Sequence, residues 1–269
     1  MDKEIYGKYE ITDAHSHIFP EKIAESATVN IGHFYDIPMN DCGISEKLIE
    51  SGDRIGVSRY LVCSVATTPH QVNSINHFIA EECRKHPSFT GLGALHPGSE
   101  NLEEDIEQII SLGLKGVKLH PDFQKFNADS QEAYKIYELI EGRLPLMIHC
   151  GDNRYDYSAP QRIANIHKNF PKLSIQAAHL GGYRRWEEAL GCLTGLENVW
   201  FDISSSLAFI SPERAAYMIR TYGIEKCFFG SDFPMWSHEK ELERFLALGF
   251  SEEENRLILA ENFRNFIPD

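Results

Sequence analysis

The clearest chemical pattern in the sequence is "DAHSH" at residues 13–17, which places two histidines one residue apart behind an aspartate. Because successive side chains of a β-strand alternate between its faces, Asp13, His15 and His17 would project to the same side of a strand. Two imidazoles on one face can bind a divalent metal if other segments supply further ligands. A polar surface strand with two unrelated histidines is the simpler alternative.

Residues of the same chemical type stand where other apolar, β-rich runs of the sequence end. They are His96, His120, His149, His179 and Asp232. A single histidine at a strand end more often serves structure than metal binding, and Asp232 in "GSDFP" could merely start a turn. Histidines close five of eight such runs, however, and open none of them, so the joint pattern favours a metal site. The remaining histidines are assigned structural roles: His33, His70, His77, His86, His167 and His238.

The eight runs recur at a spacing of roughly thirty residues, with helical segments between most of them. They cover residues 9–17, 58–66, 89–97, 114–121, 144–151, 173–182, 199–204 and 226–234. Three of the intervening helices have clear start and stop residues, with Ser99 before Gly113, Pro160 before Pro171, and Pro212 before Gly223.

Alternating strands and helices without a break in composition predict parallel βα units. Eight of them predict an α/β fold of the (β/α)₈ TIM-barrel type, as a single domain over residues 1–269. A doubly wound open sheet is the alternative, but no G-x-G-x-x-G loop follows the first run. We expect a distorted barrel with a long lid or interface loop over residues 19–45 and a closing helix within residues 251–269.

Composition excludes several other functions. The formal charge of −14 and the lack of a Lys/Arg cluster argue against nucleic-acid binding. No run of about 18 apolar residues would span a membrane, and the charged N-terminal segment lacks the apolar core of a secretory signal. Six scattered cysteines without a C-x-x-C pair are typical of reduced thiols. We therefore expect a cytoplasmic protein.

In a barrel, the C-terminal ends of the strands meet around the mouth, where active sites are found. If the shared strand faces point inward, His15, His17, His149, His179 and Asp232 converge. Three imidazoles and a carboxylate suit one Zn²⁺, with Mn²⁺, Fe²⁺ or Co²⁺ as alternatives, and leave a position for water. Asp232 could then hold the metal and accept the proton of that water, while His179 could polarise the substrate.

The motifs "DAHSH", "GVKLHP", "MIHCG", "AAHLGG", "FDIS" and "FGSDFP" together resemble the amidohydrolase superfamily. More narrowly, they look like the amidohydrolase-related branch that includes the aminocarboxymuconate-semialdehyde decarboxylase type, from about residue 11 to the end of the chain. The resemblance implies that His15, His17, His149 and Asp232 hold one metal. It also implies that Asp232 accepts a proton and that His179 is a catalytic acid or base, or orients the substrate.

The motif "GVKLHP" leaves the number of metals open. In binuclear relatives a lysine on the fourth strand is carboxylated and bridges two metals, and this chain has both Lys118 and His120 there. We expect one metal, with Lys118 or His120 contacting the substrate. Asp13 we expect one layer deeper than the ligands, as a supporting residue or structural anchor.

The segment that follows His149, "GDNRYDYSAPQR", adds Arg154, Tyr155 and Tyr157 as candidate substrate-binding residues. An arginine side chain is well shaped to bind a carboxylate, which favours an anionic substrate. Alternatively, Arg154 pairs with a neighbouring aspartate.

Two reactions fit these residues. The leading hypothesis is a metal-dependent hydrolase of a small amide, lactone or ester that carries a carboxylate. The alternative is a non-oxidative decarboxylase of an aromatic or unsaturated carboxylic acid, which uses nearly the same ligands. A catalytically inactive, metal-stabilised binding module is a third possibility, which the presence of Asp232 disfavours. We expect a small-molecule substrate, no nucleic-acid or membrane partner and, by analogy alone, a homodimer.

Overall fold

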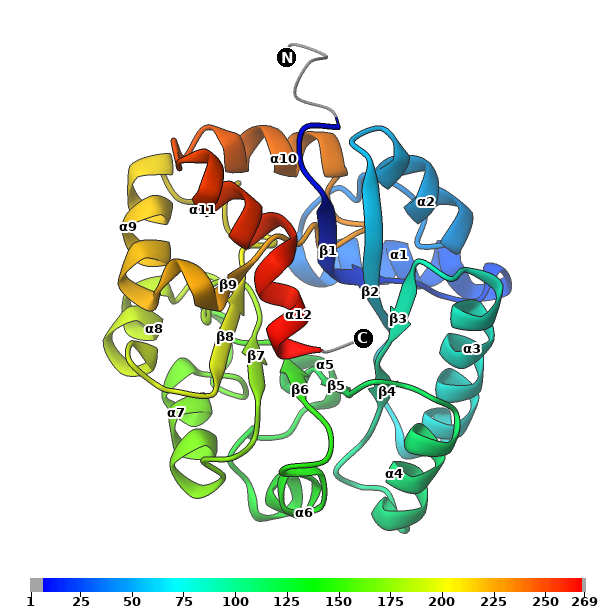
Figure 1. The fold of residues 1–269 in the computed structure, drawn as a ribbon. Coiled ribbons are helices and arrows are strands. Elements are labelled where there is room, and N and C mark those ends of the chain that lie inside the picture. The colour runs from blue at the N-terminus through cyan, green and yellow to red at the C-terminus, as the bar shows by residue number, and fades with distance from the viewer. Residues whose placement is uncertain (1–6, 268–269) are drawn as a thin grey trace.

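The computed structural model describes residues 7–267 and shows a ring of parallel strands surrounded by helices (Figure 1). The strands in this range are β1 (Ile11–His17), β2 (Val57–Cys63), β3 (Phe89–Gly91), β4 (Gly93–Ala94), β5 (Val117–Leu119), β6 (Leu146–Ile148), β7 (Ile175–Ala177), β8 (Val199–Asp202) and β9 (Cys227–Phe228). Each of the eight predicted runs overlaps one of these strands or, in the third run, two short pieces.

The strands form two hydrogen-bonded groups, β1–β3 and β4–β9, which are joined at both seams. At the first seam β3 and β4 follow each other directly, and the amide of Leu92 between them donates to the carbonyl of Val62 at 2.9 Å. At the second seam the amide of Ala14 in β1 donates to the carbonyl of Phe229, just after β9, at 2.9 Å. These bonds connect the groups into an eight-stranded (β/α)₈ barrel, as predicted.

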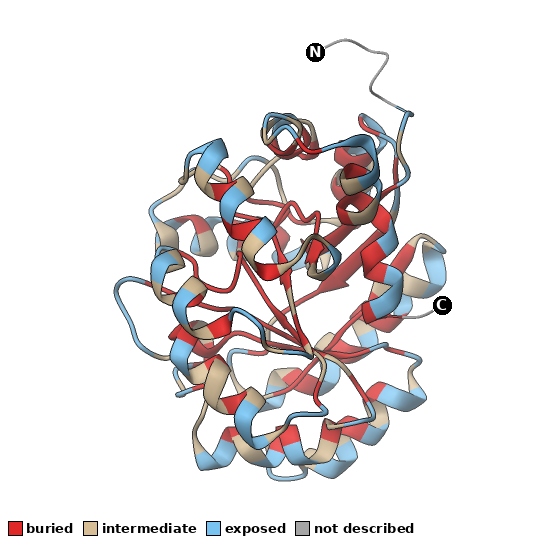
Figure 2. Ribbon diagram, turned by 60° about the vertical axis from the view of Figure 1, so that its left-hand side comes forward, coloured by how far each residue is buried: buried red, intermediate tan, exposed pale blue. Residues whose placement is uncertain are grey.

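The helices lie outside the ring of strands, with buried residues on their inner faces and exposed residues outside (Figure 2). The helices of the described range are α1 (Glu21–Tyr35), α2 (Ser45–Asp53), α3 (Val72–Lys85), α4 (Leu102–Ser111), α5 (Pro121–Gln124), α6 (Gln131–Ile140), α7 (Pro160–Asn169), α8 (Trp186–Leu193), α9 (Pro212–Tyr222), α10 (His238–Leu246), α11 (Glu252–Arg256) and α12 (Asn262–Phe266), with the 3₁₀ turns η1 (Pro69–Gln71) and η2 (Ile224–Lys226) and the π-helical turn η3 (Leu257–Glu261). None of these helices is long and apolar enough to cross a membrane. The six cysteines are all free thiols.

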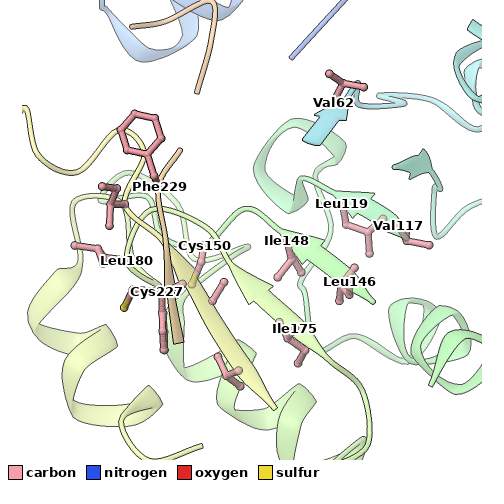
Figure 3. Close-up of a cluster of buried hydrophobic side chains, with 14 of the residues drawn as sticks. Val62, Val117, Leu119, Leu146, Ile148, Cys150, Ile175, Leu180, Cys227 and Phe229 are labelled. Atoms are coloured by element: carbon pink, nitrogen blue, oxygen red, sulfur yellow. The ribbon is translucent and has the colours of Figure 1, made fainter. Parts of the chain in front are cut away.

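Strand side chains alternate between a helix-facing layer and the barrel interior. Val117 and Leu119 of β5 belong to the apolar layer between strands and helices (Figure 3). Lys118 between them points the other way, and its Nζ lies 3.2 Å from Sδ of Met147 inside the barrel. This period of two is the reason that residues at alternate positions of neighbouring strands meet at the barrel axis.

The C-terminal segment forms the predicted closing helix. The elements α11, η3 and α12 follow one another without a break, and α12 crosses the opening of the barrel (Figure 1). Phe263 and Phe266 pack against the interior residues Ala14, Leu61 and Met147. Burying one phenylalanine side chain contributes about 2–3 kcal/mol. The side-chain amide of Asn262 in α12 donates to the carbonyl of Cys227, the first residue of β9, at 2.9 Å, so this helix closes the end of the barrel that lies opposite the strand C-termini.

The connection after β1 differs from the predicted long loop, because most of it is helix α1. The buried positions of this helix are Ala24, Thr28 and Gly32, spaced four residues apart. Small and polar residues at this spacing do not read as an apolar stripe, so the sequence pattern missed the helix. Close packing explains Gly32: a Cβ there would lie 3.0 Å from the carbonyl oxygen of Ile37.

Candidate metal centre and active site

The predicted donors gather at the C-terminal ends of the strands. A small cavity of about 20 Å³, enough for one water molecule, has His17, His120, His149, His179 and Asp232 in its wall. His15, which is fully buried, lies directly beside His17. The two imidazole Nε2 atoms are 3.2 Å apart. The barrel therefore brings together residues that are more than two hundred positions apart in the chain.

Three of these side chains form a compact triangle of donor atoms. Nε2 of His15 and Nε2 of His17 lie 3.7 Å and 3.4 Å from Oδ1 of Asp232. With Zn–N and Zn–O bonds near 2.1 Å, two ligands of a tetrahedral zinc are about 3.4 Å apart. The observed separations match the edges of such a site, so the residues present fit a divalent metal.

Each member of the triangle is oriented by a protein partner on its other polar atom. Nδ1 of His15 lies 3.2 Å from Oδ2 of Asp202, and Nδ1 of His17 lies 3.6 Å from Sγ of Cys63. Oδ2 of Asp232 accepts a hydrogen bond of 2.5 Å from the hydroxyl of Ser205. Partners of this type fix the ring orientation and leave the remaining atom for the metal.

Cys63 and Asp202 were missed as supporting residues by sequence reasoning. Cys63 ends β2, which pairs with β1. Its thiol lies close enough to His15 and His17 that the three ligand atoms fall within 4.8 Å of one another. Asp202 ends β8, within the "FDIS" motif. Strand-end position could have drawn attention to both residues, but which histidine each one contacts depends on barrel geometry.

Several site residues have unusual backbone conformations. Asp232, His179 and Ser205 have positive φ angles of 55°, 61° and 50°. Non-glycine residues in this region cost on the order of 1–3 kcal/mol and cluster at functional sites. For Asp232, the amide donates to the carbonyl of His15 at 2.8 Å, which ties the two candidate ligands together.

The pKa values of the triangle are shifted in different directions by burial and by neighbouring charges. Burial, assisted by the nearby Lys118, lowers the pKa of His15 to about 4, so this ring is neutral at pH 7. Burial also opposes charge on His17, but Cys63 and Asp232 outweigh it and raise the pKa to about 9. The neighbouring histidines hold the pKa of Asp232 well below its usual range despite burial. Because metals bind neutral imidazole, metal loading would release the His17 proton.

His149 and His179 lie beside the triangle with ring nitrogens that face each other. Nδ1 of His149 is 3.1 Å from Nε2 of His179, and Nε2 of His149 is 2.9 Å from the carbonyl oxygen of Gly151. Because a carbonyl oxygen only accepts, we assign the proton of His149 to Nε2. By the same rule the proton of His179 is assigned to Nδ1, which lies 3.1 Å from the carbonyl oxygen of Ser204. Burial keeps the pKa of His149 well below its usual range. The lone pair of this predicted third imidazole ligand faces His179.

Lys118 and His120 occupy different levels of the site. Nζ of Lys118 is buried and lies 2.9 Å from Nε2 of His15, beneath the small cavity. His120 lines the cavity, where its ring stacks between those of Phe123 and His149 at centroid distances of 3.8 Å and 3.9 Å. Burial and the adjacent His149 hold the pKa of His120 well below its usual range.

Tyr35 is a site residue that the sequence did not reveal. It ends helix α1, and its hydroxyl lies 2.9 Å from Nε2 of His120. Its ring also packs against that of Tyr183 at a centroid distance of 5.4 Å. Helix α1 thus places an aromatic hydroxyl over the mouth, a position that follows from the helix and not from any recognisable motif.

Arg154, Tyr155 and Tyr157 lie near the mouth but outside the wall of the small cavity. The guanidinium of Arg154 makes hydrogen bonds of 2.9 Å and 2.6 Å to the buried Asp152, and it stacks on the ring of Phe34. Tyr155 is 44% exposed. The carbonyl of Tyr157 accepts a hydrogen bond from the amide of Ala128. Arg154 therefore makes the aspartate pairing that the sequence left as one of two alternatives.

A (β/α)₈ barrel with imidazoles and a carboxylate converging at its C-terminal strand ends defines a class of metal-dependent barrel enzymes. A family model described as amidohydrolase matches residues 12–266, so the chain belongs to the amidohydrolase family. This match confirms the superfamily resemblance seen in the motifs. A comparison with curated protein sequences gives no significant match.

Solved structures with the same fold include both lyases and hydrolases. A 5-carboxyvanillate decarboxylase from Sphingomonas paucimobilis matches with a TM-score of 0.74 at 14% identity, covering 97% of this chain and 99% of its own. A probable 2-pyrone-4,6-dicarboxylic acid hydrolase from Acinetobacter baumannii matches with a TM-score of 0.70 at 16% identity, covering 96% and 98%. A dihydroxybenzoic acid decarboxylase from Polaromonas sp., with bound manganese, matches with a TM-score of 0.71 at 14% identity, covering 96% of both chains.

Proposed function

We propose that this enzyme is a metal-dependent hydrolase of a small lactone, ester or amide, with one Zn²⁺ as the preferred metal. The observation that carries the proposal is that the two oxygens of the Asp232 carboxylate have different partners. Oδ1 faces Nε2 of His15 and His17, while Oδ2 is held by Ser205, and the whole group borders a cavity with room for one water. A carboxylate placed in this way can hold a metal and also take a proton from an attacking water.

The residues support a simple sequence of roles. His15, His17 and Asp232, with His149 as a further donor, would hold a divalent metal, which would lower the pKa of a bound water from 15.7 toward about 7. Asp232 accepts the proton as the water attacks the carbonyl carbon. His179 lines the same cavity, where a proton on Nε2 would be placed to reach the substrate oxygen. Loss of one such donor typically lowers kcat by about 10²–10³.

A decarboxylase of an aromatic carboxylic acid is the second candidate. It is favoured by the similarity of the fold to decarboxylases for 5-carboxyvanillate and dihydroxybenzoic acid. The same residues would hold the metal to which the substrate binds. Asp232 would exchange a proton with the aromatic ring of the substrate. The two reactions differ in their products, because hydrolysis adds water whereas decarboxylation releases CO₂.

The test uses protein loaded with Zn²⁺ or Mn²⁺ and a panel of lactones, esters, amides and aromatic acids. We expect hydrolysis that is lost on chelation and restored by the metal. Asp232→Asn should lower kcat by about 10³ or more, since it removes both a ligand and the proton acceptor. Asp36→Asn, at an exposed site on the same mouth, is the control. CO₂ release without added water would replace the hydrolase by the decarboxylase, and Asp232→Asn with full activity toward either product would refute both.

A further inference from the structure

A second, larger cavity of about 630 Å³ lies next to the small one. Its walls come from the end of β1, helix α1, the segment between β2 and α3, the first turn of α3, and the segment of α5. The roles assigned so far to the metal ligands and to His179 do not use it. Its volume falls within the range of about 300–1,000 Å³ that is usual for small-molecule sites.

The two cavities are neighbours, because His17, Ile31 and Phe123 line both of them. Nε2 of His17 is one corner of the donor triangle. A molecule in the large cavity can therefore contact His17, one of the proposed metal ligands, directly.

The wall of the large cavity is mainly apolar. Its apolar surface is contributed by residues that include Phe19, Ile23, Ile31, Phe34, Val65 and Ile75. Apart from His17, only Asp122 and Lys125 among its described wall residues carry a charged group. Lys125 is exposed, whereas Asp122 is buried at 3% exposure beside His149. A carboxylate near the metal side and a lysine open to solvent do not make a binding site for an anionic group.

We propose that this cavity is a specificity subsite for an apolar, uncharged part of the substrate, an alkyl chain or a ring. The proposal rests on the proposed metal-dependent function, and it names the substrate class that this function serves. The reacting group lies at the metal ligands, and the rest of the substrate extends between α1 and α3. Burial of each additional methylene group should tighten binding about fourfold until the cavity is full.

The experiment measures binding, not turnover. The probes are acetohydroxamate, hexanohydroxamate and octanohydroxamate, whose head group binds zinc, titrated calorimetrically into zinc-loaded protein. We expect affinity to rise steeply with tail length. Equal affinity for the three would overturn the proposal. So would tighter binding of a tail of the same length that ends in a carboxylate, because the subsite would then hold a charged group.

Helix α1 offers a matched pair of variants. Ile23 and Val29 are both 47% exposed, but only Ile23 lines the large cavity. Ile23→Glu should weaken octanohydroxamate at least tenfold and leave acetohydroxamate within twofold, whereas Val29→Glu should change neither. Equal effects of the two variants would overturn the proposal. Ile75→Trp, which fills the cavity from α3, should also selectively remove the gain from the long tail.

Hexanol and octanol separate this proposal from the proposed function. These alcohols lack a metal-binding head group, so the comparison of tail lengths can be repeated with them on the metal-free protein. Failure of every hydroxamate, with a preference for octanol over hexanol that Ile23→Glu removes, would count against the metal site and for the subsite. Tight hydroxamate binding that does not depend on the length of the tail would count for the metal site and against the subsite.

Discussion

Nε2 of His238 in helix α10 lies 2.8 Å from Oδ2 of Asp13 in β1, with both side chains fully buried. The same carboxylate accepts hydrogen bonds from the amide of His15 at 3.0 Å and from the amide and hydroxyl of Ser231 at 2.9 Å and 2.5 Å. Burial alone would raise the pKa of Asp13, but His238 holds it below its usual range. Asp13 thus connects the backbone of the candidate ligand His15 with Ser231, the residue before the candidate ligand Asp232.

We predict that His238→Ala lowers the free energy of unfolding by about 2–4 kcal/mol, because the buried carboxylate loses a strong donor. It should also weaken zinc binding about 10- to 100-fold, as is usual when support behind a ligand is lost. Urea unfolding of the metal-free protein and competition with a zinc chelator measure the two effects. The exposed His70→Ala is the control. A loss of stability with unchanged zinc affinity would mean that the pair is structural only.

Lys118 provides a prediction about the number of metals. Its Nζ contacts Nε2 of His15, yet the triangle of His15, His17 and Asp232 is complete without it. We expect about one metal per chain in the wild type and in Lys118→Met, measured by inductively coupled plasma mass spectrometry. A value near two that falls to one in Lys118→Met would instead identify a carboxylated, bridging lysine.

Glu241 should make stability depend on pH. It is buried in α10 beside Arg244, and burial raises its pKa from 4.5 to about 7 although Arg244 opposes the shift. Between these values the folded protein holds a proton that the unfolded chain has released, so the free energy of unfolding falls as pH rises, by up to about 3 kcal/mol. Glu241→Gln should therefore gain stability over the wild type at pH 8 but little at pH 5 in urea unfolding. Glu243→Gln, on the exposed face, should show no such difference.

Arg154 should matter more for stability than for substrate binding. Its partner Asp152 is fully buried, and removal of the guanidinium leaves that carboxylate without its ion pair. We expect Arg154→Met to cost about 1–3 kcal/mol in thermal unfolding, since Arg154 itself is partly exposed and screened. The KM for a neutral ester should stay within about twofold. A tenfold rise in KM confined to carboxylate-bearing substrates would assign it to substrate binding after all.

The sequence alone determined the barrel and most of the candidate donors. Strand periodicity and strand-end position are local properties, and parallel strands around an axis place equivalent ends together, so His15, His17, His179 and Asp232 were predictable neighbours. The same logic placed His149 at the mouth.

Only the tertiary structure decided what each of these residues contacts. Helix α1 was missed because it buries small residues, and with it Tyr35 and the large cavity. The support of His17 by Cys63 and of Asp13 by His238 depends on how distant segments pack, which no local pattern encodes. Side-chain partners are set by barrel register and helix packing at the scale of single ångströms, whereas periodicity reports only which face a residue is on.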